Sequence, residues 1–488
     1  MDNPRSVETF QSRCRFGLAQ ADITPPVGIY HRMWGAASHD RSTGVHRPLT
    51  ASALAFGSLE EGGPPSASEQ ILILLDHVLL WPAEMDLLLE RASRLSGVGR
   101  DSLLVVFSHT HAAGLMGMER ESLPGGELIR GYLERVAASV GDLISAARSR
   151  RQTAIIRYGF GRCSLARNRD LWDEQLQQYV CGYNPEGPSD DALLVARVTG
   201  ERDEPLASIV NYACHPTTLA WQNTLISPDF PGAMREVVQR ETGAPCLFLQ
   251  GASGDLGPKE GFVGDPEVAD RNGRQLGYAA LSALCDLPPP NRCFRYTGPR
   301  ESGATLGTWS WTRFSRGAVG RSRRWKMRRW AIDLPYRGTS LTRAQVESEL
   351  ERCQAEEAQA RAGGDQTRAA DFRALAEQQT RRLQRLEFLP SGESMACSIW
   401  LWSLGDAFWL AVEGEPYQLL QTSLRERFPG VPIMVASLAN GARANYLPPA
   451  AAYGSGRYPD TIAVLAKGAL ETIIDQAGNQ IDKWLRSE

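Results

Sequence analysis

Short apolar runs alternate with longer amphipathic stretches along most of the chain. Continuous apolar runs of about 4–8 residues are typical of strands buried on both faces. Six such runs, each ending at a polar or glycine-containing cluster, are predicted as strands: 71–75, 103–107, 207–213, 246–249, 408–412 and 433–436. Three stretches between them are predicted as helices: 83–95, 127–148 and 233–242. This alternation predicts an α/β fold in which a mixed sheet is flanked by helices.

Residues 340–386 depart from this alternation. They are dense in Ala, Arg, Glu and Gln, and Gly363-Gly364-Asp365 predicts a turn between two charged helices of roughly 22 residues each. The sequence therefore predicts a single α/β domain from residues 1–300 and 390–488, with an insertion at 301–389 that contains this helical hairpin. A solvated hairpin is the simplest interpretation. A lid, or a contact between copies in a homo-oligomer, is the alternative.

Charge limits the class of partner. The net charge of −3 argues against nucleic acid, whose binding usually needs a strong basic excess. The stretch 313–330 does carry eight basic residues together with Trp325 and Trp330. Such a segment can meet phosphates or anionic lipid, but a solvated basic and aromatic loop, or an interface, is the prediction.

Three features of the sequence predict where in the cell the protein is located. The longest apolar run, 71–81, is far shorter than the ~20 residues of a transmembrane helix. Residues 1–22 carry charges throughout and lack the apolar region of a secretion signal. The nine cysteines are scattered singly, without a CxxC pair, which is typical of a reducing compartment. We therefore expect a cytoplasmic protein with no transmembrane segment.

Candidate metal ligands stand where three predicted strands end. His109 and His111 follow one strand, two residues apart, so extended geometry places both imidazoles on one side. His215 ends a second strand and Glu415 follows a third. Each of them alone is more often a hydrogen-bonded or capping residue. Together they are the ligand types of a catalytic zinc site with an open position for water, at the strand ends where α/β sheets bind ligands.

At these residues the sequence resembles the neutral/alkaline non-lysosomal ceramidases and their shorter bacterial relatives. The resembling blocks keep their order along most of the chain: Asp22-Ile23-Thr24-Pro25-Pro26, Gly44-Val45-His46, Ser108-His109-Thr110-His111, Asn168-Arg169, 211–215, Ile226-Ser227-Pro228-Asp229, Gly254-Asp255-Leu256-Gly257-Pro258, Gly414-Glu415-Pro416, and the tyrosines Tyr446, Tyr453 and Tyr458. The chain ends about thirty residues after the last of these. The resemblance therefore implies a short bacterial member without the C-terminal β-sandwich domain of the longer ceramidases.

The resemblance also implies a set of site residues. It implies one Zn²⁺ ion with four ligands: His109, His215, Glu415 and Tyr446. It further implies that His111 faces the substrate carbonyl or the attacking water, and that Arg169 and Tyr458 hold or polarise the polar head of the substrate. Asp229 and Asp255 are interpreted as acceptors for the second N–H of the ligating histidines or as turn anchors.

One departure from the family pattern bears on mechanism. Gly257 stands where the family has a serine that was long considered a nucleophile. Ser253 lies nearby, but its surroundings are not a G-x-S-x-G elbow, because the fifth residue is Asp255. An acyl-serine mechanism is therefore disfavoured, whereas a zinc-activated water needs no serine.

The sequence and the resemblance together predict a zinc-dependent amidohydrolase. It would cleave a C–N amide bond of an N-acyl lipid or a related amide with a zinc-activated water, which places it in lipid metabolism. Two alternatives stay open. One is a zinc esterase, a lactonase or an amidase for a small polar metabolite, because the same groups serve all these bonds. The other is a non-catalytic metal-containing binding protein, suggested by Gly257 and opposed by the retention of all four ligands.

Overall fold

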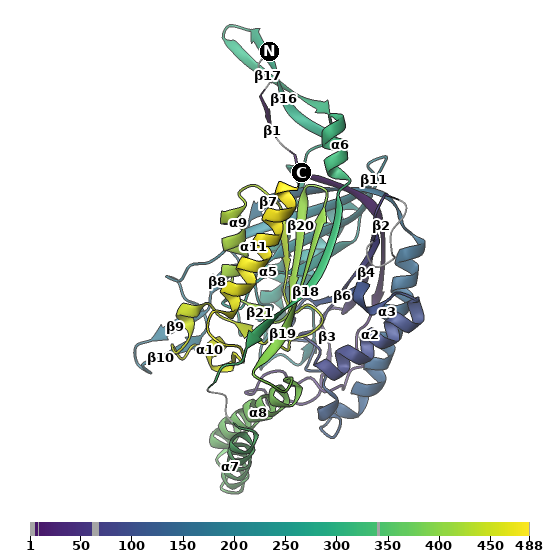
Figure 1. The fold of residues 1–488 in the computed structure, drawn as a ribbon. Helices are drawn as coiled ribbons and strands as arrows, with labels where there is room; N and C mark the ends of the chain where they lie inside the picture. The colour runs from purple at the N-terminus through teal and green to yellow at the C-terminus, as the bar shows by residue number, and fades with distance from the viewer. Residues whose placement is uncertain (1–4, 8, 61–67, 339–341, 488) are drawn as a thin grey trace.

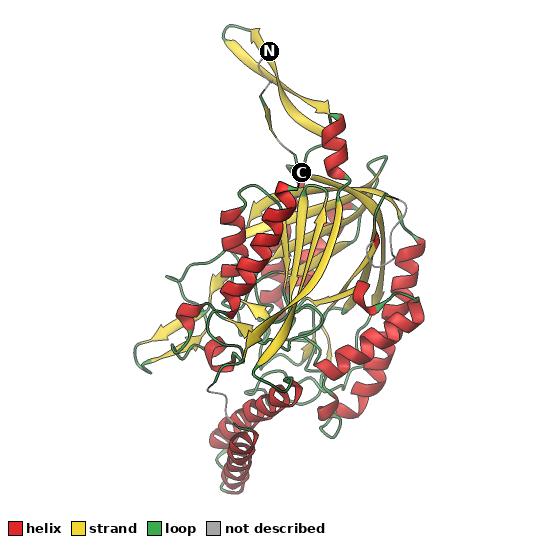
Figure 2. Cartoon of the chain, viewed as in Figure 1, coloured by secondary structure: helices red, strands yellow, loops and turns green. Residues whose placement is uncertain are grey.

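Two β-sheets lie face to face at the centre of the molecule, and helices cover the outer face of each (Figure 1, Figure 2). The computed structural model describes residues 5–7, 9–60, 68–338 and 342–487. The larger sheet has eight strands in the order β14-β12-β11-β7-β2-β4-β5-β6. In chain order these are β2 (Gln11–Asp22), β4 (Thr50–Gly57), β5 (Glu69–Leu75), β6 (Leu103–Phe107), β7 (Gln152–Arg162), β11 (Ala192–Gly200), β12 (Pro205–Tyr212) and β14 (Cys246–Gln250).

The larger sheet is mixed. The pairs β5–β6 and β12–β14 are parallel, and the other neighbours are antiparallel. Its two edge strands, β6 and β14, also contact each other, so the sheet curls. This curl brings the end of β6 close to the end of β12, although the two strands lie far apart in the strand order.

The smaller sheet packs inside this curve. It consists of β18 (Trp325–Pro335), β19 (Ser394–Leu404), β20 (Ala407–Val412) and β22 (Ile433–Ala436), in that order. Alternate residues of β19 point to opposite faces. Trp400 and Trp402 face the larger sheet, whereas Ile399 and Leu401 face the outer helices. The ring of Phe56 lies 6.0 Å from that of Trp402, so aromatic residues fill much of the space between the sheets.

Helices complete a four-layer arrangement. The outer face of the larger sheet is covered by α2 (Pro82–Ser96), α3 (Ile129–Ser149), α4 (Phe230–Thr242) and α5 (Pro266–Cys285). The outer face of the smaller sheet is covered by α9 (Leu419–Arg427) and α11 (Ala469–Arg486). The prediction of a mixed sheet flanked by helices is confirmed, and the second, facing sheet is an addition to it.

Short elements lie at the rims of the two sheets. Eight short strands pair two by two. They are β3 (Gly44–Val45), β8 (Ala166–Asn168), β9 (Asp170–Asp173), β10 (Gln178–Cys181), β13 (Leu225–Ile226), β15 (Leu256–Pro258), β21 (Glu415–Pro416) and β23 (Tyr446–Leu447). The short helix α10 (Tyr458–Ile462) follows β23. Among the described residues no helix is long and apolar enough to span a membrane.

The predicted helical hairpin is formed by α7 (Arg343–Ala362) and α8 (Gln366–Phe388). Residues 340 and 341, with which the prediction begins, lie outside the described residues. Gly364 adopts a positive φ of 78° at the turn, a backbone conformation that glycine reaches without steric cost. The hairpin projects from one end of the molecule (Figure 1).

The prediction of a loop over residues 313–330 is wrong. This stretch contains α6 (Arg316–Ser322) and the first half of β18, which pairs with β19 along its whole length. The long arginines hide the strand pattern, because their apolar stems cover aromatic surface while the charged ends reach water. The guanidinium of Arg329, for example, lies 5.1 Å from the ring centre of Trp400.

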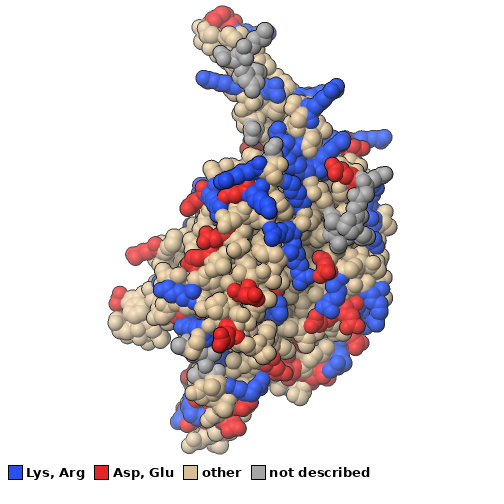
Figure 3. Space-filling view, in the orientation of Figure 1, with Lys and Arg blue, Asp and Glu red and all other residues tan. Residues whose placement is uncertain are grey.

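A separate three-stranded sheet projects from the opposite end (Figure 1). It consists of β1 (Ser6–Val7), β16 (Arg292–Glu301) and β17 (Thr305–Arg313). On the face shown in Figure 3, Lys and Arg gather where this projection meets the body and mix with Asp and Glu elsewhere.

Asn211, in β12, joins the two sheets, and we expect its loss to cost stability. Its side-chain amide donates to the carbonyls of Leu249 and Val435, at 2.9 and 2.8 Å, and accepts from the Val435 N–H at 2.9 Å. Asn211→Leu keeps the volume but leaves these buried groups unpaired, so we expect a loss of about 2–4 kcal/mol in the free energy of unfolding. Urea denaturation measures it. The exposed-site control Asn479→Leu should cost less than about 0.5 kcal/mol, and equal losses in both would contradict this account.

Candidate metal centre

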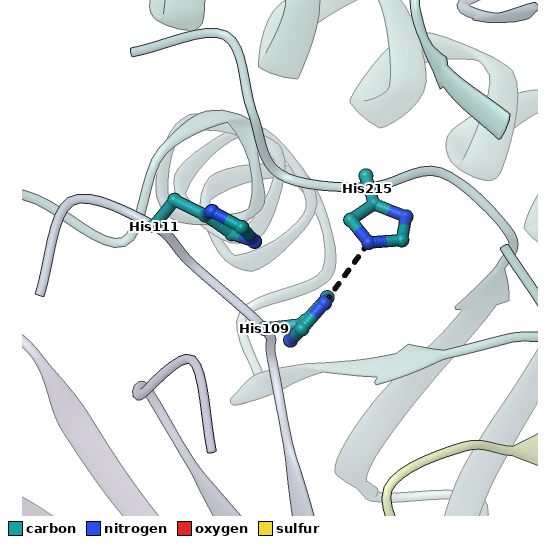
Figure 4. A group of neighbouring side chains, drawn as sticks. All are labelled: His109, His111 and His215. Atoms are coloured by element: carbon teal, nitrogen blue, oxygen red, sulfur yellow. Dashed lines mark hydrogen bonds between the residues drawn. The ribbon is translucent and has the colours of Figure 1, made fainter. Parts of the chain in front are cut away.

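His109 and His215 meet at the end where the larger sheet curls together. His109 follows β6 and His215 follows β12, and their Nε2 atoms are 3.0 Å apart (Figure 4). One oxygen of Glu415, in β21, lies 3.2 Å from Nε2 of His109 and 3.1 Å from Nε2 of His215. The hydroxyl of Tyr446 lies 3.4 Å from the same nitrogen of His215. The four ligand candidates of the sequence are therefore neighbours.

Local backbone geometry explains how Glu415 and Tyr446 come together. The two residues are direct partners in the parallel pair β21–β23. Gly414, just before Glu415, has a φ of 81°, and a Cβ at this position would lie 2.4 Å from the carbonyl oxygen of Asn445. Only glycine fits so close an approach of the two chains. His109 itself has a φ of 66°, a strained conformation for a residue with a side chain.

The tautomers of the two histidines follow from their second nitrogens. Nδ1 of His109 lies 2.6 Å from the carbonyl oxygen of Val78, and Nδ1 of His215 lies 2.7 Å from that of Ser253. A carbonyl oxygen only accepts, so in the neutral rings each Nδ1 carries the proton and each Nε2 presents a lone pair. The two Nε2 atoms then have no proton to donate to each other or to Glu415.

Four electron-pair donors therefore converge on one point: two imidazole nitrogens, a carboxylate oxygen and a phenol oxygen. This is the donor set of a cation site, and two nitrogens with two oxygens suit Zn²⁺. Burial and then Arg169 lower the pKa of His215 to about 3, so its imidazole is neutral at neutral pH, as a ligand must be.

His111 lies beside His109 and His215, and the three imidazoles form a triangle (Figure 4). Its ring centre is 5.0 Å from that of His109 and 5.9 Å from that of His215. One ring nitrogen from each of the three histidines lies within 4.8 Å of the other two, which is compatible with a shared metal ion. Both nitrogens of His111 are buried, and neither has a hydrogen-bond partner among the described residues. Such atoms are costly unless a ligand meets them.

An aromatic wall borders His111. The ring of Trp34 lies 5.2 Å from the ring of His111 and also contacts Trp221, at 6.3 Å, and Phe262, at 5.5 Å. Trp221 is partly exposed, so the wall extends from the metal centre toward solvent. No periodic pattern predicts this wall, because its three members come from separate loops.

Arg169 and Tyr458 lie on the Tyr446 side of the centre. Arg169 is buried and donates from one nitrogen to the hydroxyl of Tyr446, at 3.0 Å, and to the carbonyl of Gly254, at 2.8 Å. The ring of Tyr458 lies 5.8 Å from that of Tyr446 and is 41% exposed, so it stands between the buried ligand candidates and the surface. The structure thus brings all seven predicted site residues into one region, while Tyr453 instead donates to the carbonyl of Leu465.

Asp229 and Asp255 are turn anchors, and the interpretation that they orient the histidines is wrong. Asp229 accepts from the backbone N–H groups of Phe230 and Leu219, and Asp255 accepts from Gln418. The backbone carbonyls of Val78 and Ser253 accept the second N–H of the two histidines in place of these aspartates. A main-chain acceptor leaves no trace in the sequence.

Ser253 does not lie at the point where the candidate ligands converge. The hydroxyl of Ser253 lies 3.2 Å from Nδ1 of His215, behind the ring and away from the converging Nε2 atoms. It also accepts a hydrogen bond from Gln250. A Cβ at Gly257 would have ordinary contacts, 3.7 Å from Thr217 and 3.9 Å from Arg169, so there is room for a side chain that this protein lacks.

Two solved structures resemble the chain along almost its whole length. One, described as "Ceramidase complexed with C2", has a TM-score of 0.64 and 16% identity and covers 98% of this chain and 76% of its own. The other, neutral ceramidase from Pseudomonas aeruginosa, has a TM-score of 0.62 and 17% identity and covers 98% of this chain and 75% of its own. No family model and no curated protein matches the sequence. Likeness at this identity concerns the fold, and the chain therefore has a ceramidase-like fold.

Proposed function

We propose that this protein is a zinc-dependent hydrolase that cleaves the C–N bond of an N-acyl lipid or a related amide. The observation that carries the proposal is the close approach of Nε2 of His109 and Nε2 of His215 to each other and to one oxygen of Glu415, while each Nδ1 lies against a backbone carbonyl. The fold adds support, because the two similar structures are of ceramidases.

His109, His215, Glu415 and Tyr446 would hold the zinc ion. When bound, Zn²⁺ supplies Lewis acidity that lowers the pKa of water toward 7 and polarises a carbonyl. Without a cation, burial and then Glu415 raise the pKa of Tyr446 well above its usual value, so the phenol stays protonated. A dication acts in the opposite direction and favours the phenolate.

The surrounding residues position the substrate and move protons. Burial, the largest effect, lowers the pKa of His111 well below its usual value, so its imidazole is neutral and carries a lone pair on one nitrogen. His111 would take a proton from the attacking water and return it to the leaving amine. Tyr458 and Arg169 would stabilise the negative charge that develops on the carbonyl oxygen, Arg169 acting through the Tyr446 hydroxyl that it contacts. Trp34 would shield His111 from bulk water.

Chelation tests this proposal. Incubation with 1,10-phenanthroline should abolish hydrolysis of the amides that the protein cleaves, in a side-by-side panel of N-acyl sphingoid bases and short amides and esters. One equivalent of Zn²⁺ should restore it. The non-chelating isomer 1,7-phenanthroline is the control. Turnover that survives removal of the metal would contradict the proposal, and faster cleavage of esters than of amides would replace the amide bond by an ester.

A further inference from the structure

The end of α8 is anchored to the loop that carries Trp34, whose ring contacts His111. Arg381 of α8 donates to the carbonyl of Met33, the residue before Trp34, whose ring packs on His111. One turn earlier, Glu377 accepts from the buried Arg120 at 2.7 Å. These contacts fix the helical hairpin to the body of the protein beside Trp34. The hairpin is therefore more than a solvated insertion.

Two other arginines on this part of α8 have acidic partners. Arg373 pairs with Asp40 at 2.7 Å and Arg381 pairs with Glu377 at 2.8 Å. Arg385 follows Arg381 by four residues and so lies on the same face of the helix. Its Nε is buried and has no hydrogen-bond partner, and no carboxylate of the described residues forms an ion pair with its guanidinium.

Arg385 lies within electrostatic reach of two candidate metal ligands, Glu415 and Tyr446, and of Tyr458. The groups that act on its charge are the Tyr458 hydroxyl, the guanidinium of Arg381, the Glu415 carboxylate and the Tyr446 hydroxyl. Burial, the largest effect, lowers the pKa of Arg385, and Tyr458 acts against burial. A partly buried guanidinium without a paired anion is costly, and a forked guanidinium binds a carboxylate through two parallel hydrogen bonds.

We propose that Arg385 binds a carboxylate of the substrate, so that the amide cleaved here is an N-acyl amino acid or a compound of the same kind. A single guanidinium balances a carboxylate better than a doubly charged phosphate, particularly with the Glu415 carboxylate nearby. The aromatic wall of Trp34, Trp221 and Phe262 offers apolar surface for the acyl chain. This inference rests on the proposed amidase function and narrows its substrate class.

A pair of non-cleavable probes tests this inference on the zinc-loaded protein. In 4-oxoundecanoate a methylene replaces the amide N–H of N-octanoylglycine, and 4-oxoundecanamide is its uncharged counterpart. Calorimetric titration of the wild type should show at least about tenfold tighter binding of the carboxylate. Arg385→Ala and the bulkier Arg385→Met should remove this preference and leave the affinity for the amide unchanged. Arg385→Lys should keep part of it, and Arg382→Ala, on the same helix, should keep all of it.

Three results would overturn the inference: equal affinities in the wild type, binding of neither probe, or a preference that persists without Arg385. The last result would assign the carboxylate to the metal or to Arg169. Zinc content of the same samples reports on the proposed function separately. A wild type that binds no zinc but prefers the carboxylate through Arg385 would contradict the hydrolase and support the anion site.

Discussion

Glu415→Ala is expected to remove the metal ion and the activity together. The variant deletes the carboxylate on which Nε2 of His109 and Nε2 of His215 converge, so the donor set loses its negative charge. We expect zinc affinity to fall by more than about 100-fold and turnover by at least about 10³-fold. Inductively coupled plasma mass spectrometry of the purified variant, with rates measured at fixed free zinc, gives both values.

Glu413 provides a matched control two residues away. Its carboxylate is also buried, but it pairs with Arg443 at 3.0 Å, away from the histidines. Glu413→Ala should lower stability and leave zinc content at the wild-type level. If both variants kept their zinc, Glu415 would not be a ligand, and if both lost it, the effect would be one of folding.

His111→Ala is expected to separate metal binding from catalysis. Among the described residues the two buried nitrogens of His111 have no hydrogen-bond partner, and its ring contacts that of Trp34, while the other two histidines share Glu415. If it acts as the proton carrier, zinc content stays at the wild-type level and turnover falls by about 10²–10⁴-fold. Zinc content and turnover number, measured on the same samples, decide this.

The competing expectation is a third histidine ligand, which the mutual distances of the three imidazoles also permit. In that case His111→Ala loses zinc as Glu415→Ala does, and Tyr446→Phe keeps it. His39→Ala is the matched control, because His39 contacts His31 and not the metal centre. Unchanged turnover in His111→Ala would remove this residue from the chemistry.

The sequence predicts the strands well where both faces are buried. The runs at β6 and β22 are apolar at every position and end abruptly, so their limits are as predicted. The strand prediction fails at β18, because the apolar stems of its arginines cover aromatic surface there, whereas apolar residues do so in the other strands. The facing arrangement of two sheets depends on tryptophans such as Trp402, which a local pattern does not distinguish from any other buried residue.

At the candidate site, too, the sequence identifies some groups and not others. The side chains that converge on the centre carry distinctive chemistry and stand at strand ends, so the sequence identifies His109, His215 and Glu415 as candidates together. The sequence does not show what orients the two histidines, because the acceptors are the backbone carbonyls of Val78 and Ser253. The sequence pattern does not single out Arg385 either, because it is one arginine among many in its helix. Its electrostatic effect on the site is apparent only once the fold brings it within reach of Tyr458.

Anomalous diffraction at the zinc edge tests the central claim most directly, on crystals of protein purified without added metal. We predict one zinc peak per chain, bonded to Nε2 of His109, Nε2 of His215, the carboxylate of Glu415 and the hydroxyl of Tyr446. The absence of any peak in crystals soaked with Zn²⁺, or a peak that none of these four residues touches, would contradict the account.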